Sequence, residues 1–256
     1  MNRRTFLFYG GAMLWGLLGP GKRARAEILR DFPLERSPRL AVIIDDIGYS
    51  RSLAKRFWDL QVPLTFAVLP RLEKSRDLAE EIHARGHEIM LHQPMEPHER
   101  DRDPGPGAVY VGFEEERIRE VLEENLAVVP FASGVNNHMG SRFTERRREM
   151  EAVLDVVGRR SLYFVDSLTS AQSVAFQEAQ NRRMPTACRN LFLDGWRNED
   201  FILRQLFLLE RHAYRCGWAV GIGHPYPETV QALARYLRAP HQPGRFFVHM
   251  SVILSL

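Results

Sequence analysis

The 256-residue sequence has only two cysteines, Cys188 and Cys216, which excludes a fold built on several disulfides. The two thiols would be able to pair in an oxidising compartment, but two free thiols fit the sequence equally well. The sequence also has no internal repeat and no low-complexity segment, which excludes repeat arrays and biased, disordered chains. About 230 residues follow position 26, enough for one large domain with a substantial core.

Long hydrophobic runs are absent as well. The N-terminal apolar stretch is about 14 residues long, short of the roughly 20 residues that a membrane-spanning helix needs. It follows Arg3-Arg4 and precedes Ala24-Arg25-Ala26, which gives a basic start, a short apolar centre and a small-residue cleavage site. The arginine pair resembles a bacterial twin-arginine signal. The alternative is a membrane anchor. We favour an export signal over residues 1–26, cleaved after Ala26, which predicts a periplasmic or secreted protein with no stable membrane span.

Without residues 1–26, the chain has no excess of positive charge. The formal net charge of the whole sequence is +3, but residues 1–26 hold five basic and no acidic side chains, so the mature chain carries −2. The charge therefore gives no support to a nucleic-acid partner. Residues 27–38 form a polar, proline-punctuated lead-in, and we expect a single catalytic domain over residues 39–256.

What is present is a repeated strand–helix pattern. Leu40–Ile44 is an uninterrupted apolar run, which is typical of a strand buried on both faces of a parallel sheet. Strand and helix patterns then alternate at least six times, which predicts an α/β protein with a parallel sheet, open or closed into a barrel. Strands are expected at 40–44, 64–69, 87–91, 134–138, 161–165, 190–193, 218–223 and from 246. Helices are expected after Gly48 and over 73–85, 113–128, 144–158, 170–181, 198–216 and 227–238.

Aspartate and histidine recur where these strands end. A barrel gathers the carboxyl ends of its strands around one mouth, so these side chains are expected to meet there. Adjacent residues of a strand point to opposite sides, so Asp45 and Asp46 should have different roles. The full set is Asp45, Asp46, His92, His138, Asp166, Asp194 and His224.

Histidines and aspartates in this arrangement predict a divalent metal site, with zinc the expected ion. Catalytic zinc usually has three protein ligands and one open position; we assign Asp46, His92 and His138 as the ligands. Asp45 is then placed to accept a proton from water, and His224 to protonate a leaving group. These parts suit metal-assisted hydrolysis of an amide or ester. Two simpler interpretations stay open: the aspartate pair as a helix N-cap and His138 as a structural histidine.

Several short motifs follow one another in a specific order along the chain. They are Ile44-Asp45-Asp46, Gly86-His87-Glu88-Ile89, His92-Gln93-Pro94-Met95-Glu96-Pro97, Asp103-Pro104-Gly105-Pro106-Gly107, Asn136-Asn137-His138-Met139-Gly140-Ser141, Phe164-Val165-Asp166-Ser167 and Gly223-His224-Pro225. This order resembles the metal-dependent polysaccharide deacetylases, and specifically their divergent branch. The resemblance covers roughly residues 38–255 and implies a distorted (β/α) barrel of about seven strands, export, and removal of acetyl groups from glycans.

The resemblance maps a base onto Asp45 and a metal ligand onto Asp46. The family's second motif has two histidines four positions apart, whereas here His92 is followed by Glu96 at the fourth position. Either Glu96 or His138 supplies the missing ligand, and we favour His138. The arginine-proline-aromatic motif of the usual deacetylases is not visible. Further residues expected to orient ligands or touch the substrate are Glu96, Asn137, Asp166 and Asp194.

These observations predict an exported, metal-dependent hydrolase that removes acetyl groups from a cell-envelope glycan. The alternative is a catalytically degenerate glycan- or peptidoglycan-binding envelope protein of the same fold, motivated by Glu96 and by the missing arginine motif. A metal phosphohydrolase is a third hypothesis, since carboxylates at strand ends also hold Mg²⁺. The histidine-rich ligand set and the lack of a phosphate-cradling glycine loop count against it.

Overall fold

The computed structural model describes residues 38–255. The expected export signal and all but the last residue of the expected lead-in lie outside the described residues. The residues that are described belong to one compact unit.

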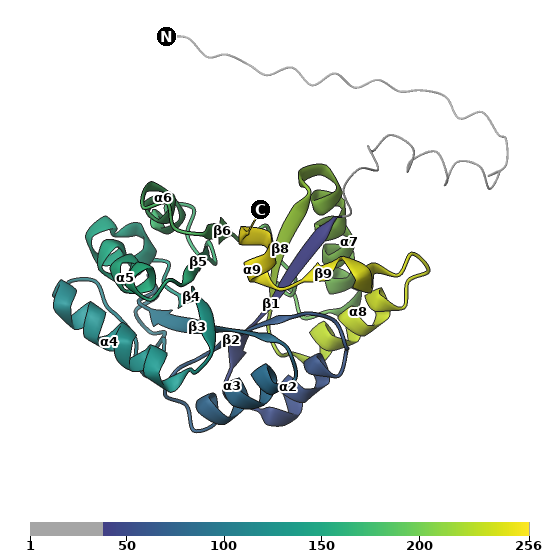
Figure 1. Ribbon diagram of the computed structural model, residues 1–256, viewed down its shortest axis with the longest axis horizontal. Helices are drawn as coiled ribbons and strands as arrows, with labels where there is room; N and C mark the ends of the chain where they lie inside the picture. Colours follow the sequence, from purple (N-terminus) through teal and green to yellow (C-terminus); the bar gives the residue numbers. More distant parts are fainter. Residues whose placement is uncertain (1–37, 256) are drawn as a thin grey trace, which may run out of the picture. The chain divides into compact units, whose positions relative to one another are not determined.

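The centre of the fold is a parallel sheet that curves into an open barrel (Figure 1). Every strand pair printed for it is parallel, and the spatial order is β6-β5-β4-β3-β2-β1-β8-β7, with β9 beside β1. Within residues 38–255, no pairing joins β6 to β7, so the barrel stays open there. The strands are β1 (Arg39–Ile47), β2 (Thr65–Val68), β3 (Glu88–Met95), β4 (Ala132–Met139), β5 (Tyr163–Asp166), β6 (Thr186–Cys188), β7 (Leu191–Phe192), β8 (Trp218–Gly223) and β9 (Phe247–Val248).

The fold class expected from the sequence is confirmed, with one strand more than expected along the path of the sheet. The addition is β6, whose three residues Thr186–Cys188 offer no apolar run to detect. The expected final strand is reduced to the two residues of β9, and a short helix that was not expected follows it.

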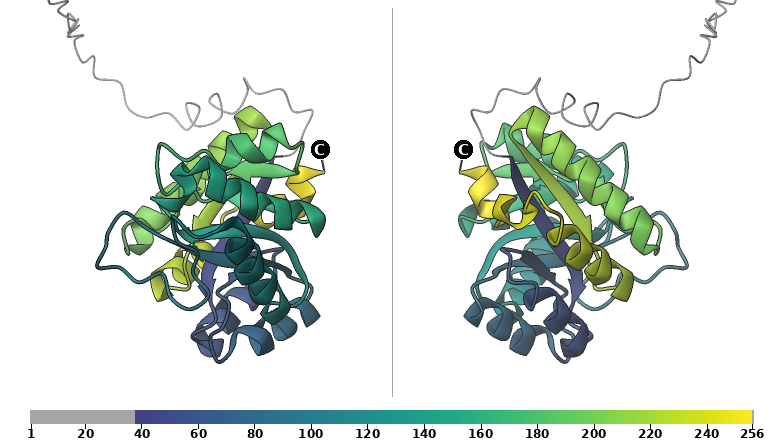
Figure 2. Two further views of the ribbon diagram at one scale, coloured as in Figure 1. Left: turned by 90° about the vertical axis from the view of Figure 1, so that its left-hand side faces the viewer. Right: turned by 90° about the vertical axis from the view of Figure 1, so that its right-hand side faces the viewer.

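Most helices lie outside the curved sheet. Figure 2 shows α4 and α5 covering one side and α7 and α8 the other. Ser50 and Asn198 begin α2 and α7 as N-caps, because each side chain accepts a hydrogen bond from the backbone N–H three residues on. The helices are α2 (Arg51–Trp58), α3 (Ser75–Ala84), α4 (Glu115–Val128), α5 (Arg147–Arg159), α6 (Ala175–Asn181), α7 (Glu199–Cys216), α8 (Pro227–Leu237) and α9 (Met250–Leu254), with 3-10 turns at Phe143–Glu145 and Pro243–Phe246.

Two hydrophobic clusters separate the outside of the barrel from its interior. In β1, Leu40, Val42 and Ile44 pack in the large cluster under the helices, whereas Ala41 and Ile43 belong to the inner cluster. The period of two predicts that the next inner position is 45. The same alternation runs through Met90 to position 92 of β3, and through Val220 and Ile222 to position 224 beyond β8. Asp45, His92 and His224 therefore continue the inner series at the barrel's carboxyl end.

Helix α9 closes the other end. Its Met250 and Ile253 belong to the inner cluster, and the Met250 N–H donates to Thr65 Oγ1 at 3.0 Å. Thr65 in turn donates to the buried carboxylate of Glu88, which also accepts from the Tyr163 hydroxyl. With its amino end plugged in this way, the barrel interior is approached from the carboxyl end of the strands.

Two questions that the sequence left open concern the thiols and the membrane. Cys188 is half-buried and Cys216 is exposed, and the two are not joined by a disulfide. Among the described residues there is no helix with both the length and the apolar character required to cross a bilayer.

Candidate metal centre and active site

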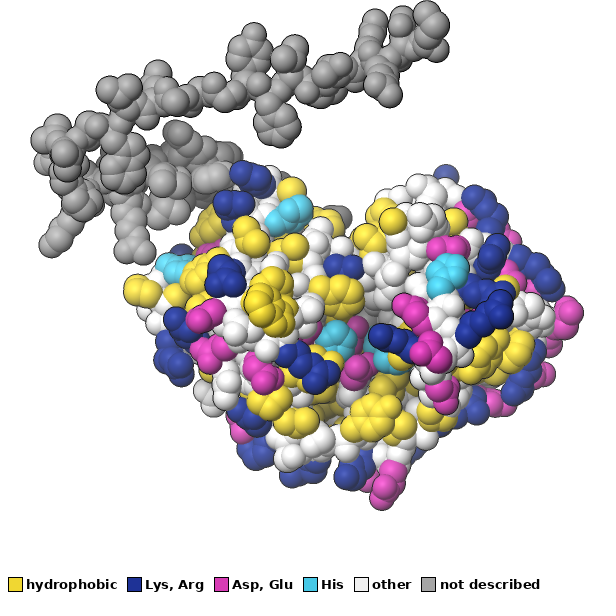
Figure 3. All heavy atoms as spheres, turned by 180° about the vertical axis from the view of Figure 1, so that it is seen from behind, with side chains coloured by type: hydrophobic (Ala, Val, Ile, Leu, Met, Phe, Trp, Pro, Cys, Tyr) yellow, Lys and Arg dark blue, Asp and Glu magenta, His cyan; other side chains and the backbone are white. Residues whose placement is uncertain are grey.

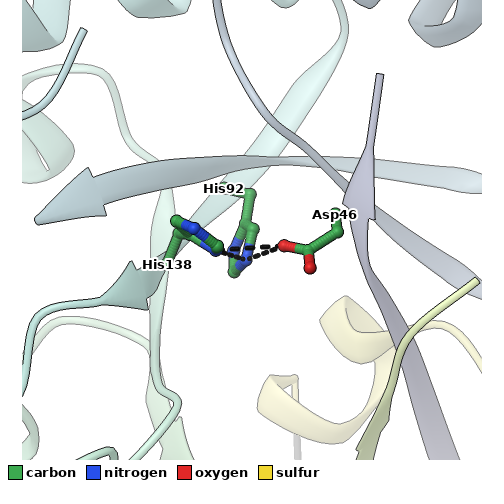
Figure 4. A group of neighbouring side chains, drawn as sticks. All are labelled: Asp46, His92 and His138. Atoms are coloured by element: carbon green, nitrogen blue, oxygen red, sulfur yellow. Dashed lines mark hydrogen bonds and ion pairs between the residues drawn. The ribbon is translucent and has the colours of Figure 1, made fainter. Parts of the chain in front are cut away.

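Three side chains converge at the barrel mouth with their ligand atoms nearly equidistant (Figure 4). His138 Nδ1 lies 3.0 Å from Asp46 Oδ1, His92 Nε2 lies 3.2 Å from the same oxygen, and the two nitrogens are 3.1 Å apart. His92 is 2% exposed, His138 17% and Asp46 25%, so the group is sheltered but reachable from solvent. It is the one group within residues 38–255 that brings together three such ligand atoms.

Asp46 joins this group because the backbone of β1 changes direction. Alternation along the strand would send Asp46 toward the helices, opposite to Asp45. Its φ of +56° lies in the left-handed region instead, which aspartate tolerates better than most residues. Both carboxylates therefore approach His92, with Asp45 Oδ2 3.6 Å from its Nε2. A strained residue held at such a position is typical of a functional site.

Asn136 fixes the orientation of His92. The β3–β4 register places His92 beside Asn136. Asn136 Nδ2 donates to Asp45 Oδ1 at 2.8 Å, so its Oδ1 is left to accept from His92 Nδ1 at 2.8 Å. The network thus assigns the proton to Nδ1 and directs the lone pair of Nε2 toward Asp46 and His138. This arrangement is the one that a metal-binding histidine requires.

The geometry of the three ligand atoms fits a small divalent metal. Ligands about 2.0–2.1 Å from one tetrahedral zinc are about 3.3 Å apart, close to the separations found here. Asp46 Oδ1 is buried and receives no hydrogen bond of normal geometry from the described residues. This oxygen is therefore free to bind a metal and faces two imidazole nitrogens. One carboxylate and two imidazoles form a ligand set that suits zinc.

Electrostatics separate the two neighbouring carboxylates. Burial raises the pKa of Asp45 above its ordinary value, and the charges of His92 and His224 only partly oppose this. Burial acts on Asp46 in the same direction, but its close contacts with His138 and His92 outweigh it and hold the pKa far below its ordinary value. For His92, burial opposes the charged form, yet the charges of Asp45 and Asp46 raise its pKa. The ionised form is thus favoured in Asp46, whereas the raised pKa of Asp45 suits this carboxylate to accept a proton.

His224 is held by a second buried carboxylate. Its Nδ1 lies 2.9 Å from Asp194 Oδ1, and its backbone N–H donates to Asp194 Oδ2 at 2.5 Å. Thr229 Oγ1 also donates to that oxygen. Burial lowers the pKa of His224, but the hydrogen bond and charge of Asp194, with smaller contributions from Asp45 and Asp46, raise it to about 9. Because Nδ1 is occupied, Nε2 is the nitrogen left to act on a substrate.

These groups surround one cavity of about 290 Å³. Figure 3 shows this face of the molecule, where histidine side chains lie in a hollow with lysine and arginine on its rim. Residues that line the cavity include Asp45, His92, Asn137, His138, Phe192 and His224. The cavity holds both proposed proton carriers and two of the proposed ligands.

Two of the expected site residues, Glu96 and Asp166, hold loops instead of facing this group. Glu96 Oε1 binds Arg142 at 2.6 Å and its Oε2 accepts from the Val111 N–H, so Glu96 does not join the ligand atoms. Asp166 accepts from the Leu168 and Phe176 N–H groups and from Ser173, shaping the turn after β5. It follows Val165 of the inner cluster and therefore belongs to the outer face.

Asn137 both lines the cavity and holds the chain around it. Its side chain accepts from the Ser167 N–H and donates to the Met139 carbonyl, which connects the end of β4 to the turn after β5. From the sequence, no role in the site was assigned to Asn136. Its position two residues before His138, on the same side of β4, was the available signal.

A model of the divergent polysaccharide deacetylase family matches residues 42–254. The chain belongs to this family. The uncharacterised YibQ protein of Escherichia coli strain K12 is 33% identical over 196 residues, which are 76% of this chain and 61% of that protein. An uncharacterised protein of Haemophilus influenzae is 28% identical over 200 residues, covering 78% of this chain and 71% of that protein. The match thus spans less than two thirds of the E. coli relative.

Solved structures support the same fold. The uncharacterised protein ATU2773 of Agrobacterium tumefaciens C58 superposes with a TM-score of 0.78 and 28% identity, over 90% of this chain and 95% of that one. BA3943 of Bacillus anthracis, described as a CE4 family pseudoenzyme, has a TM-score of 0.54 and 13% identity over 85% of this chain and 66% of its own. The second likeness concerns the fold alone.

Proposed function

We propose that this protein is an exported, metal-dependent deacetylase that removes acetyl groups from a cell-envelope glycan. The observation that carries the proposal is the triangle of ligand atoms from Asp46, His92 and His138, flanked by one carboxylate and one imidazole suited to opposite proton transfers. Family membership supports the reaction type, and the sequence pattern of residues 1–26, which is that expected of an export signal, supports the location. Zinc is the proposed ion because the donor set is one carboxylate and two imidazoles.

The residues divide the work as follows. A divalent metal held by Asp46, His92 and His138 would polarise the acetyl carbonyl and acidify a water. Asp45 accepts the proton of the attacking water, because its burial makes the carboxylate a stronger base than usual. His224, protonated below about pH 9 and anchored by Asp194, donates a proton to the departing sugar nitrogen or oxygen. Acetate and the free amino or hydroxyl group are the products.

A glycan-binding protein without turnover is the second candidate. BA3943 is described as a pseudoenzyme, and a mutant of it as having restored enzymatic activity. Proteins with this fold therefore occur both with and without enzymatic activity. In our chain the position of Glu96 and the absence of the arginine motif favour this candidate. The presence of Asp45, His224 and two of the three proposed ligands in one cavity favours the enzyme.

The test measures metal first and turnover second. Elemental mass spectrometry of purified protein should find about one zinc-like metal per chain, lost in His138→Ala and in Asp46→Ala. Asp45→Asn should keep the metal and lose acetate release from acetylated oligosaccharides. Glu96→Ala is the matched control, because Glu96 lies beside the site without joining the ligand atoms. Metal without acetate release on a broad panel of acetylated glycans would support the binding protein, and turnover that survives Asp45→Asn would refute the assigned base.

Export has its own test. Replacing Arg3-Arg4 by two lysines in the full chain should leave the protein in the cytoplasm if the twin-arginine interpretation is correct. Fractionation with an antibody to the folded domain reads this out. Unchanged export would refute the twin-arginine route.

A further inference from the structure

Arg189 is an immobilised cation beside the cavity, and none of the described carboxylates forms an ion pair with it. Its Nε donates to the Ser167 carbonyl at 2.7 Å and its Nη2 to the Leu168 carbonyl at 3.0 Å. Its backbone N–H donates to the Asp166 carbonyl, and the guanidinium carbon lies 3.8 Å from the centre of the Phe192 ring. Three contacts therefore hold this side chain in one place, and the fourth fixes its backbone.

The turn after β5 supplies the two carbonyl groups that hold the Arg189 side chain. Asp166 Oδ1 accepts from the Leu168 N–H, and Leu168 has a φ of +50°, a left-handed conformation that costs a leucine free energy. This turn leaves the successive carbonyls of Ser167 and Leu168 to accept from the same guanidinium. Asp166 thus acts on the site indirectly, through the placement of Arg189.

The guanidinium keeps unused hydrogen-bonding capacity. Arginine has five N–H donors, and the two described bonds use Nε and one hydrogen of Nη2. Both hydrogens of Nη1 and one hydrogen of Nη2 remain, and the edge formed by these two nitrogens can bind a carboxylate with two parallel hydrogen bonds. Asp166, whose charge acts on the guanidinium more strongly than that of Asp45, has both oxygens occupied by other donors.

A second observation at the same wall points to a ligand. The Ser167 hydroxyl belongs to a residue that is 1% exposed, it lines the cavity, and it has no hydrogen-bond partner among the described residues. The Phe192 ring, over which the Arg189 guanidinium lies, also lines the cavity. This ring stacks on His224 with ring centroids 6.0 Å apart. Elsewhere on the cavity Glu99 and Arg102 have opposite charges.

We propose that Arg189 and Ser167 form a carboxylate-recognition subsite, so that the substrate is an acidic glycan whose acetyl-bearing sugar lies next to a carboxylate. The inference rests on the proposed function, since it specifies the substrate of that site. A carboxylate only accepts hydrogen bonds, which matches the unused N–H donors of the Arg189 guanidinium and the unpartnered hydroxyl of Ser167. Arg189 and Ser167 are specificity residues here, and Asp45 and His224 keep the proton transfers.

The test compares acids with their neutral esters. Zinc-loaded Asp45→Asn protein is titrated calorimetrically with an oligosaccharide of alternating N-acetylglucosamine and glucuronate, with one of N-acetylglucosamine and N-acetylmuramate, and with the methyl esters of both. We expect at least one acid to bind about tenfold or more tighter than its ester, the range of a charge-assisted bidentate contact. Arg189→Gln in this background should abolish the difference and leave the ester's affinity unchanged.

Controls separate recognition from folding and from turnover. Arg204→Gln removes the same charge from an exposed position of α7 and should keep the preference. Ser167→Ala removes a hydroxyl without a described partner, so it should fold normally and lose part of the preference even if Arg189→Gln fails to fold. Equal affinity for acids and esters, no binding of any of the four, or a preference that survives Arg189→Gln overturns the inference. If the protein binds acids with the expected preference but the unmutated protein releases no acetate, the proposed deacetylase activity is refuted. The proposed carboxylate-recognition subsite is still supported in that case.

Discussion

The pair formed by His224 and Asp194 gives the sharpest prediction. Asp194 has a fully buried side chain that accepts from His224 Nδ1 and the His224 backbone N–H. Replacing it by asparagine keeps the size and shape of the side chain but removes the negative charge. The expected result is a large fall in the pKa of His224, because burial then acts on the imidazole with its main opposing charge removed.

The magnitude follows from the structure. The pKa of about 9 lies roughly 2.5 units above the ordinary value of 6.5, which corresponds to about 3 kcal/mol of differential stabilisation of the protonated ring. Asp194→Asn should lower the pKa to about 6.5 or below. Since the folded-state pKa is raised, the stabilisation is complete below about pH 6.5 and is lost as the pH rises through about 9. The unfolding free energy of the unmutated protein should therefore fall across that window, and that of Asp194→Asn should not.

NMR titration of the histidine rings reads the pKa directly. The titration is made on metal-free protein, because a divalent cation in the neighbouring site would lower the pKa of His224. Asp166→Asn is the control, since it neutralises another fully buried carboxylate that does not contact His224. A pKa of His224 that stays near 9 in Asp194→Asn would refute the assignment of Asp194 as the group that keeps this imidazole protonated.

Three further predictions concern the metal centre and the core. Asn136→Ala should lower zinc affinity about 10- to 100-fold, measured by competition with a chelator, because His92 loses the partner that fixes its Nδ1 proton; unchanged affinity would contradict that role. Glu96→Ala should leave zinc stoichiometry unchanged in the same assay, and a loss of metal would return Glu96 to the ligand set. Gly134→Ala should destabilise the protein by about 1–3 kcal/mol in denaturant unfolding, because the new Cβ would lie 2.1 Å from the Tyr163 ring. Gly195→Ala meets no atom within 4 Å and should change little.

The fold, and the grouping of Asp46, His92 and His138 at one mouth, were accessible from the sequence because both depend on periodicity. Buried parallel strands are continuous apolar runs, and side chains beyond their carboxyl ends have only one mouth to enter. Position 45 continues the inner series of β1, and position 224 that of β8. The expectation that His138 and not Glu96 meets Asp46 and His92 agrees with the three measured separations.

The remaining features depend on contacts between distant segments, which no local pattern encodes. Glu96 is withdrawn from the centre by Arg142, which lies 46 positions away in the sequence. The left-handed conformation of Asp46 is a backbone property that the sequence Asp-Asp-Ile-Gly does not reveal. The short strand β6 is formed by pairing with β5, since Thr186–Cys188 has no strand pattern of its own.

The proposed base and a proposed metal ligand belong to one hydrogen-bonded chain. Asp45 Oδ1 accepts from Asn136, and Asn136 accepts from His92 Nδ1. While Asp45 is ionised, the amide of Asn136 is held in the orientation that leaves His92 Nε2 free for a metal. Protonation of Asp45 Oδ1 would weaken it as an acceptor for Asn136 Nδ2 and so loosen the hold on that amide. Asp45 can therefore accept the proton of water without loosening His92 only at its other oxygen, Oδ2, which is the one nearer to His92 Nε2, at 3.6 Å. The two oxygens of this single carboxylate thus have separate tasks, one fixing the ligand and one facing the reaction.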